Sequence, residues 1–189
     1  MGDSDRDVAA LILRLAVGPM LMTHGYNKVL GGGGIEGTTR WFESLGLRPA
    51  WLHARMAAAT EIGAGALITV GAGSPLPAAA VVGLMATAAA TDHRGKGFFI
   101  FKGGWEYVAV VGAAATALAA LGSGRWSVDR LLGRSRSGKG AAVFAATFGV
   151  ANAAALLAAT YRPTAPEVPG SEPTAAEAEA EAEAEATGL

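Results

Sequence analysis

Residues 8–30 read VAALILRLAVGPMLMTHGYNKVL, an apolar run whose basic side chains are Arg14, His24 and Lys28. Four more apolar stretches follow, at about residues 52–70, 76–91, 105–121 and 141–161. Each is close to the ~20 residues with which a helix crosses ~30 Å of hydrocarbon. Because backbone polar groups cannot stay unpaired in lipid, these stretches predict five membrane-spanning helices.

The composition also favours a membrane protein. Hydrophobic residues make up 51% of the 189 residues and charged residues 16%, against about 25% charged in soluble domains. The net charge of −1 gives no basis for nucleic-acid binding, and the lack of cysteine excludes disulfides and thiol chemistry within the chain. We therefore predict an all-α, polytopic bundle in the lipid bilayer, as a multi-pass protein of the plasma membrane.

The segments outside the apolar stretches have different characters. Residues 1–7 are a short polar N-terminus, and residues 35–46 alternate apolar and charged side chains at the spacing of an amphipathic helix in the membrane interface. Residues 123–140 form a basic loop, with four arginines and one lysine. Residues 162–189 are rich in Pro, Glu and Ala with little to bury, which predicts a disordered acidic tail.

The polar residues of the apolar stretches gather toward one membrane face. Sequential helices alternate in direction, so the end of the first, the start of the second, the end of the third and the start of the fourth share a face. We expect the side chains at these ends, with one deeper arginine, to line a common polar pocket: Arg14, His24, Lys28, Glu61, His93, Trp105 and Glu106. Ionisable groups in a membrane are costly and usually mark function or an internal ion pair.

Glu61 is the residue that most needs a partner. It lies about ten residues into its helix, too deep for its carboxylate to reach the headgroups. Lys28, Arg55 and Arg14 are the candidate partners. A purely structural ion pair is the alternative to a functional one.

Simpler interpretations apply to other residues of the set. Lys28 and Arg55 can extend to the headgroups, and Trp105 can belong to the interfacial aromatic belt. His53 and His93 lie near predicted helix ends, where we expect them to be solvated. Two imidazoles could ligate a haem iron, but the spacing of the histidines matches no metal motif, and we predict no metal site.

Several short motifs occur in order along residues 8–121. They are Arg14-Leu15, His24-Gly25-Tyr26-Asn27-Lys28, Trp41-Phe42, Leu45-Gly46-Leu47, Glu61-Ile62-Gly63-Ala64-Gly65-Ala66-Leu67 and Gly97-Phe98-Phe99. Together they resemble the DoxX family of small bacterial membrane proteins. The resemblance implies a four-helix core, here residues 8–122, to which residues 141–161 add a fifth transmembrane helix. It also implies membrane redox chemistry, linked to quinone in one branch and to oxidative stress in others.

Three functions follow from these observations. The first is an accessory or quinone-interacting subunit of a membrane redox or oxidative-stress system, with quinone as the cofactor and a soluble or membrane redox protein as partner. The second is a small transporter or permeation pathway, and the third is a non-catalytic membrane scaffold. Whether the chain is an enzyme does not follow from the residues.

Overall fold

The structure, a computed structural model, describes residues 2–163, and the regular elements in this part of the chain are helical. The α-helices are α1 (Asp3–Leu30), α2 (Gly34–Ser44), α3 (Ala50–Val70), α4 (Leu76–Ala90), α5 (Glu106–Leu121), α6 (Val128–Leu131) and α7 (Lys139–Thr160). A 3-10 turn, η1 (Ile100–Lys102), lies between α4 and α5. The all-α prediction is confirmed. The acidic tail lies outside the described residues, apart from its first two.

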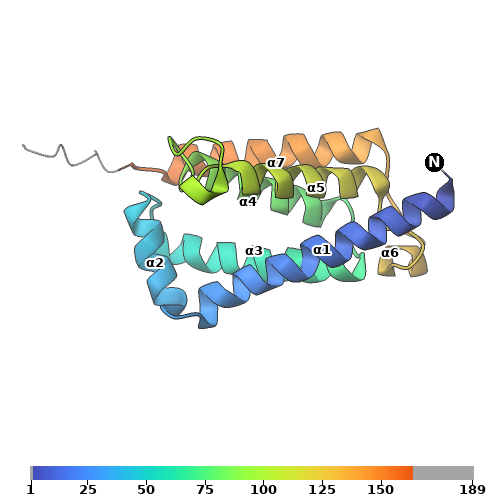
Figure 1. Cartoon of the computed structure of the whole chain (residues 1–189), viewed down its shortest axis with the longest axis horizontal. Coiled ribbons are helices and arrows are strands. Elements are labelled where there is room, and N and C mark those ends of the chain that lie inside the picture. The colour runs from blue at the N-terminus through green and yellow to red at the C-terminus, as the bar shows by residue number, and fades with distance from the viewer. Residues whose placement is uncertain (1, 164–189) are drawn as a thin grey trace, which may run out of the picture.

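The long helices form two layers, shown in Figure 1. Helices α1 and α3 lie side by side in one layer, and α4, α5 and α7 form the other. Helix α2 crosses one end of the bundle and α6 lies at the opposite end, near the N-terminus. Apolar side chains from both layers meet in a shared core: Val17, Leu21, Ile68, Val81, Met85, Val111 and Leu118.

Two of the helices can cross a membrane by length and composition. These are α1, with 28 residues, and α7, with 22 residues. Helices α4 and α5 are apolar but shorter, with 15 and 16 residues. Helix α3 has 21 residues but carries His53, Arg55 and Glu61. That all five helices span the bilayer stays a prediction.

Glycine allows the helices of each layer to approach closely. A Cβ atom added to Gly18 of α1 would lie 2.7 Å from the carbonyl oxygen of Gly65 on α3, and the reverse distance is also 2.7 Å. Between α7 and α4, a Cβ on Gly149 would lie 2.7 Å from the carbonyl oxygen of Ala79. Gly63, in contrast, faces open space. Of the two glycines of the Gly-Ala-Gly motif, only Gly65 serves the close packing that small residues permit between membrane helices.

The end of α7 is tied to the loop between α2 and α3. Leu47 and Tyr161 form an isolated antiparallel bridge. The backbone N–H of Arg48 donates to the carbonyl of Thr160 at 2.9 Å, and the N–H of Arg162 donates to the carbonyl of Gly46 at 2.7 Å. These bonds close one end of the bundle and fix α7 relative to α2 and α3.

Candidate functional site

A cavity of about 490 Å³ lies between the two helix layers. Residues from α1, α2, α3, α4, α5 and α7 line it, and most of them are apolar. All three histidines of the chain are among the lining residues. The polar lining residues are His24, Lys28, His53, Thr60, Glu61, Thr87, Thr91, Asp92, His93, Tyr107 and Asn152. A concave apolar site with a few convergent polar groups is typical of small-molecule binding sites, which measure about 300–1,000 Å³.

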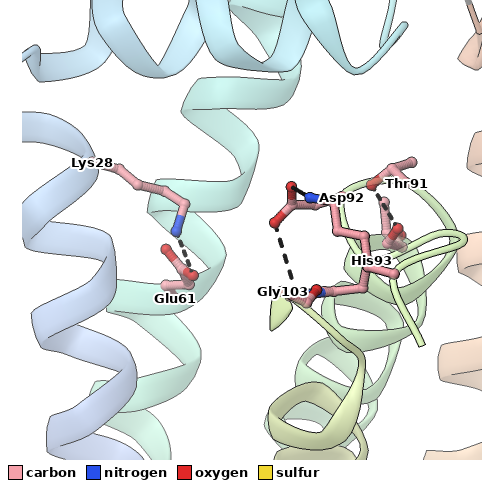
Figure 2. Close-up of polar contacts among 8 residues, drawn as sticks. Lys28, Glu61, Thr91, Asp92, His93 and Gly103 are labelled. Carbon is pink, nitrogen blue, oxygen red and sulfur yellow. Dashed lines mark hydrogen bonds and ion pairs between the residues drawn. The ribbon is translucent and has the colours of Figure 1, made fainter. Parts of the chain in front are cut away.

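Lys28 and Glu61 form an ion pair at this cavity. The Lys28 Nζ atom lies 2.8 Å from Glu61 Oε1, and the side chains are only 16% and 7% exposed. Figure 2 shows Lys28 reaching from α1 to Glu61 on α3. The helices are close here because Gly25, one turn before Lys28, packs on Ala58 of α3. Lys28 is therefore the cationic partner of Glu61 among the three candidates.

Two buried polar atoms of the cavity lining have no hydrogen-bond partner within the described residues. They are Glu61 Oε2 and His53 Nε2. A buried polar atom left unpaired costs about 1–3 kcal/mol. A bound molecule with hydrogen-bonding groups would offset that cost, so these two atoms mark where a ligand's polar groups fit.

His24 and Tyr107 lie next to the ion pair. Their ring centroids are 5.6 Å apart, and His24 precedes Lys28 by one helical turn on α1. The Tyr107 hydroxyl contacts the Met20 sulfur at 3.5 Å. Two groups that can exchange a proton, His24 and Tyr107, thus line the cavity together with Glu61.

His93 comes from the loop that follows α4. Its Nδ1 atom lies 2.6 Å from the carbonyl oxygen of Gly103, and its Nε2 atom lies 3.8 Å from a carboxylate oxygen of Asp92 (Figure 2). Because a carbonyl oxygen only accepts, Nδ1 carries the hydrogen and Nε2 is an acceptor in the neutral ring. The loop folds back over His93, which leaves its side chain only 12% exposed.

The prediction that His53 and His93 are solvated is therefore wrong. His53 is 4% exposed, because α2 and the following loop pack over the start of α3 through Phe42 and Leu47. For His93, glycines at positive φ, Gly97 and Gly103, let the loop turn back toward the end of α4. In both cases the histidine is covered by a segment that connects two of the long helices. The apolar pattern of the sequence does not predict the path of such a segment.

Arg14 does not belong to the pocket, which corrects the sequence-based expectation. Its guanidinium donates to four carbonyl oxygens, two at the end of α3 and two in the loop after α5: Ile68, Thr69, Ser123 and Trp126, at 2.7–3.1 Å. Ten residues of helix separate Arg14 from His24 by about 15 Å. The carbonyl ends of a helix attract a cation, and the planar guanidinium can serve several of them at once.

Trp105 and Glu106 also lie outside the cavity lining. Trp105 is 45% exposed and packs edge-on against Phe98, with ring centroids 5.0 Å apart. The Glu106 carboxylate accepts a hydrogen bond from the backbone N–H of Ile100 at 3.1 Å. Both residues hold the loop between α4 and α5. Arg55 stays on the surface, where it donates to the carbonyl of Trp51.

Of the seven predicted site residues, the structure brings four together: His24, Lys28, Glu61 and His93. Three further lining residues, Tyr107, Thr60 and Asn152, were not among the predicted site residues. Asn152 carries a signal, because it is the one amide in an uncharged apolar stretch. No feature of the sequence marks Thr60 or Tyr107 as a site residue. Within residues 2–163, no group of three or more His, Asp or Glu side chains is placed to hold a metal ion.

Comparison with known proteins gives one match. The DoxX family model matches residues 9–94, which include α2, α3, α4 and all of α1 except its first six residues. No curated protein and no solved structure matches the chain significantly. Helices α5, α6 and α7 lie beyond the matched segment.

Proposed function

Because the chain is a membrane protein with a DoxX-family domain over residues 9–94, we propose that it is an accessory subunit of a membrane redox or oxidative-stress system that binds a quinone between its helix layers. In this proposal it is a multi-pass protein of a bacterial plasma membrane, with α1, α3, α4, α5 and α7 crossing the bilayer. The family match supports the membrane location, and the cavity chemistry supports the ligand.

The observation that carries the proposal is the unpaired Oε2 atom of Glu61 in a mostly apolar cavity. A quinone is an apolar ring with carbonyl oxygens, and its reduction to a quinol takes up two electrons and two protons. Lys28 and His24 could donate to a carbonyl oxygen of the quinone. Glu61 Oε2 could accept from a hydroxyl of the quinol. Such a site holds both redox states and exchanges protons with them.

The electrons must have another source, because the chain has no thiol with which to supply them. We assign this role to a soluble or membrane redox protein that docks on the bundle. The chain itself would hold the quinone, exclude water from it and move protons. This division of roles fits an accessory subunit better than a complete enzyme.

Binding titrations with decylubiquinone and decylubiquinol test the proposal. Trp41 lines the cavity, so quinone binding should quench its fluorescence, and Trp41→Phe should remove that signal. We expect Glu61→Gln to weaken decylubiquinol binding about tenfold, because a charge-assisted hydrogen bond is lost, and to weaken decylubiquinone binding less. Glu106→Gln is the matched control, since Glu106 lies outside the cavity lining.

Wild-type protein that binds neither compound would contradict the proposal. Equal affinity of the wild type and Glu61→Gln for decylubiquinol would remove Glu61 from the site. Flux of small solutes through liposomes that contain the protein would favour the transporter function instead.

A further inference from the structure

Three polar side chains of the same cavity take no part in the chemistry proposed for Glu61. His53 and Thr60 lie on α3 and Asn152 lies on α7. His53 is buried with an unpaired ring nitrogen, and Thr60 and Asn152 make no side-chain hydrogen bond within residues 2–163 although they line the cavity.

Thr60 differs from the other threonines of the described residues. Ten threonines lie in residues 2–163, and nine of them donate their hydroxyl to the carbonyl four residues earlier. That local bond is the usual way to satisfy a threonine in an apolar helix. Thr60 does not make it, although it sits inside α3 with a carbonyl four residues before it. Its hydroxyl is therefore available to the cavity that it lines.

His53 lies on the same stripe of α3, seven residues or about two turns before Thr60. The ring is buried, and its Nε2 atom has no partner within residues 2–163. A buried imidazole nitrogen that lines a cavity without a partner points to a bound group there, because desolvation without a hydrogen bond is unfavourable.

Asn152 faces the same cavity from the other layer. The side-chain hydrogen bonds of α7 within the described residues are those of Thr147 and Thr160, and Asn152 takes part in neither. Asn152 is exposed at the opening of the cavity, and an amide in an otherwise apolar helix is costly in lipid unless it is satisfied. Its helical neighbours Phe148, Ala153 and Leu156 also line the cavity, so the amide lies on the cavity-facing side of α7.

Asn152 and Thr60 lie at similar depth in the bundle. The bridge between Tyr161 and Leu47 joins the residue after α7 to the loop before α3, so the end of α7 and the start of α3 lie at the same end of the bundle. Asn152 is eight residues from the end of α7 at Thr160, or about 12 Å along the helix, and Thr60 is ten residues from the start of α3 at Ala50, or about 15 Å along the helix. The two side chains can therefore contact the same bound molecule from opposite walls.

Building on the proposed function, we propose that His53, Thr60 and Asn152 hydrogen-bond a second, neutral oxygen of the ligand, away from the Lys28–Glu61 pair. A hydroxyl, an amide and an imidazole match an uncharged carbonyl or hydroxyl, whereas the ion pair joins Lys28 of α1 to Glu61 of α3. The ligand class is then an apolar molecule with two separated oxygens, as in the two carbonyls of a quinone. Helix α7, outside the matched segment, thereby sets ligand specificity.

The test compares a ligand that has two opposed oxygens with one that has a single oxygen. Decylubiquinone is the first probe and 4-decylphenol the second, so the decyl chain is the same. Thr60→Val and Asn152→Leu remove the hydrogen-bonding groups with little change in shape. Thr147→Val is the matched control, because Thr147 is exposed on α7 and bonds to its own helix. Thermal unfolding of each variant checks that the bundle is intact.

We expect Thr60→Val and Asn152→Leu each to weaken decylubiquinone binding about three- to tenfold, the effect of one lost hydrogen bond. Binding of 4-decylphenol, and both affinities of Thr147→Val, should stay at the wild-type values. Unchanged decylubiquinone binding in both cavity variants would overturn the inference while the proposed function stands.

If the wild type binds no decylubiquinone, the proposed function fails, and native mass spectrometry then decides the inference. Wild type and Thr147→Val should retain a small apolar molecule through purification that Thr60→Val and Asn152→Leu lose. Equal retention in all four proteins, or no retained molecule in the wild type, would overturn it.

Discussion

Buried charged residues of this bundle are satisfied in different ways. Glu61 has a single lysine as partner, at 2.8 Å, and keeps one oxygen free within the described residues. Asp129 accepts from the backbone N–H groups of Gly73 and Ser74 and from the Ser123 hydroxyl, at 2.8–2.9 Å. The fully bonded carboxylate of Asp129 ties the loop after α3 to α6. The partly bonded carboxylate of Glu61 lines the cavity, as expected of a group that serves a ligand.

Removing the partner of Glu61 should be more harmful than removing both charges. We expect Lys28→Met to destabilise the bundle by about 3 kcal/mol, because an unpaired charge stays buried at Glu61. The double variant Lys28→Met with Glu61→Leu should recover most of that loss. Thermal or denaturant unfolding in detergent measures both effects, with Arg55→Met as the exposed control.

Equal stability of Lys28→Met and the wild type would mean that the pair is solvated and contributes little. That result would also weaken the use of Glu61 as a buried proton acceptor.

The sequence predicts the partner of Glu61 better than the partners of Arg14, because Glu61 pairs with a side chain and Arg14 with backbone carbonyls. A carboxylate ten residues into an apolar helix needs a cation, and the i, i+4 spacing of His24 and Lys28 offers one on a single face. Arg14 instead finds four carbonyls from two distant segments. Carbonyl groups are present at every residue, so only the fold reveals which of them converge on one guanidinium.

Single glycines determine which helices pack closely against one another. The apolar stretches define α1, α3, α4, α5 and α7 to within a few residues. Their partners depend on single glycines, such as Gly65 against α1 and Gly149 against α4. Because glycine is frequent in all these helices, the sequence does not distinguish a packed glycine from a free one. The four-residue helix α6 was also not predicted within the basic loop.

Gly63 and Gly65 of α3 offer a direct test of this packing. A Cβ on Gly65 would meet the Gly18 carbonyl oxygen at 2.7 Å, whereas a Cβ on Gly63 would meet nothing within 4 Å. We expect Gly65→Ala to destabilise the bundle by about 1–3 kcal/mol through overpacking. Gly63→Ala should instead stabilise it by about 0.5–1 kcal/mol, because alanine is the better helix former.

Unfolding of the two variants in the same detergent gives the comparison. Effects of the same sign at both positions would contradict the close approach of α1 and α3.

At the scale of the whole molecule, the two layers leave the cavity between them. Helices α3 and α7 both pack on α4, and each contributes one wall of the cavity. The first described residues and the end of α7 lie at opposite ends of the bundle in Figure 1. An odd number of crossings, five in our proposal, produces that arrangement in a membrane.

Reporter fusions test this topology in cells. An N-terminal and a C-terminal fusion should report opposite sides of the membrane, with fluorescent protein active on one side and alkaline phosphatase on the other. A fusion at Ser44, the last residue of α2, should report the same side as the C-terminal fusion. Both termini on one side would mean an even number of crossings and would exclude the five-span arrangement.

The bridge between Leu47 and Tyr161 has a consequence for biosynthesis. A chain emerges from the ribosome with its N-terminal segments first, and these begin to fold first. Leu47 can therefore pair with Tyr161 only after almost the entire bundle has been synthesised. Because α7 supplies the last wall, the matched helices α1 to α4 reach the bilayer before their cavity is enclosed. Under the proposed function, a lipophilic ligand from the surrounding membrane would therefore be enclosed only at the final stage of assembly.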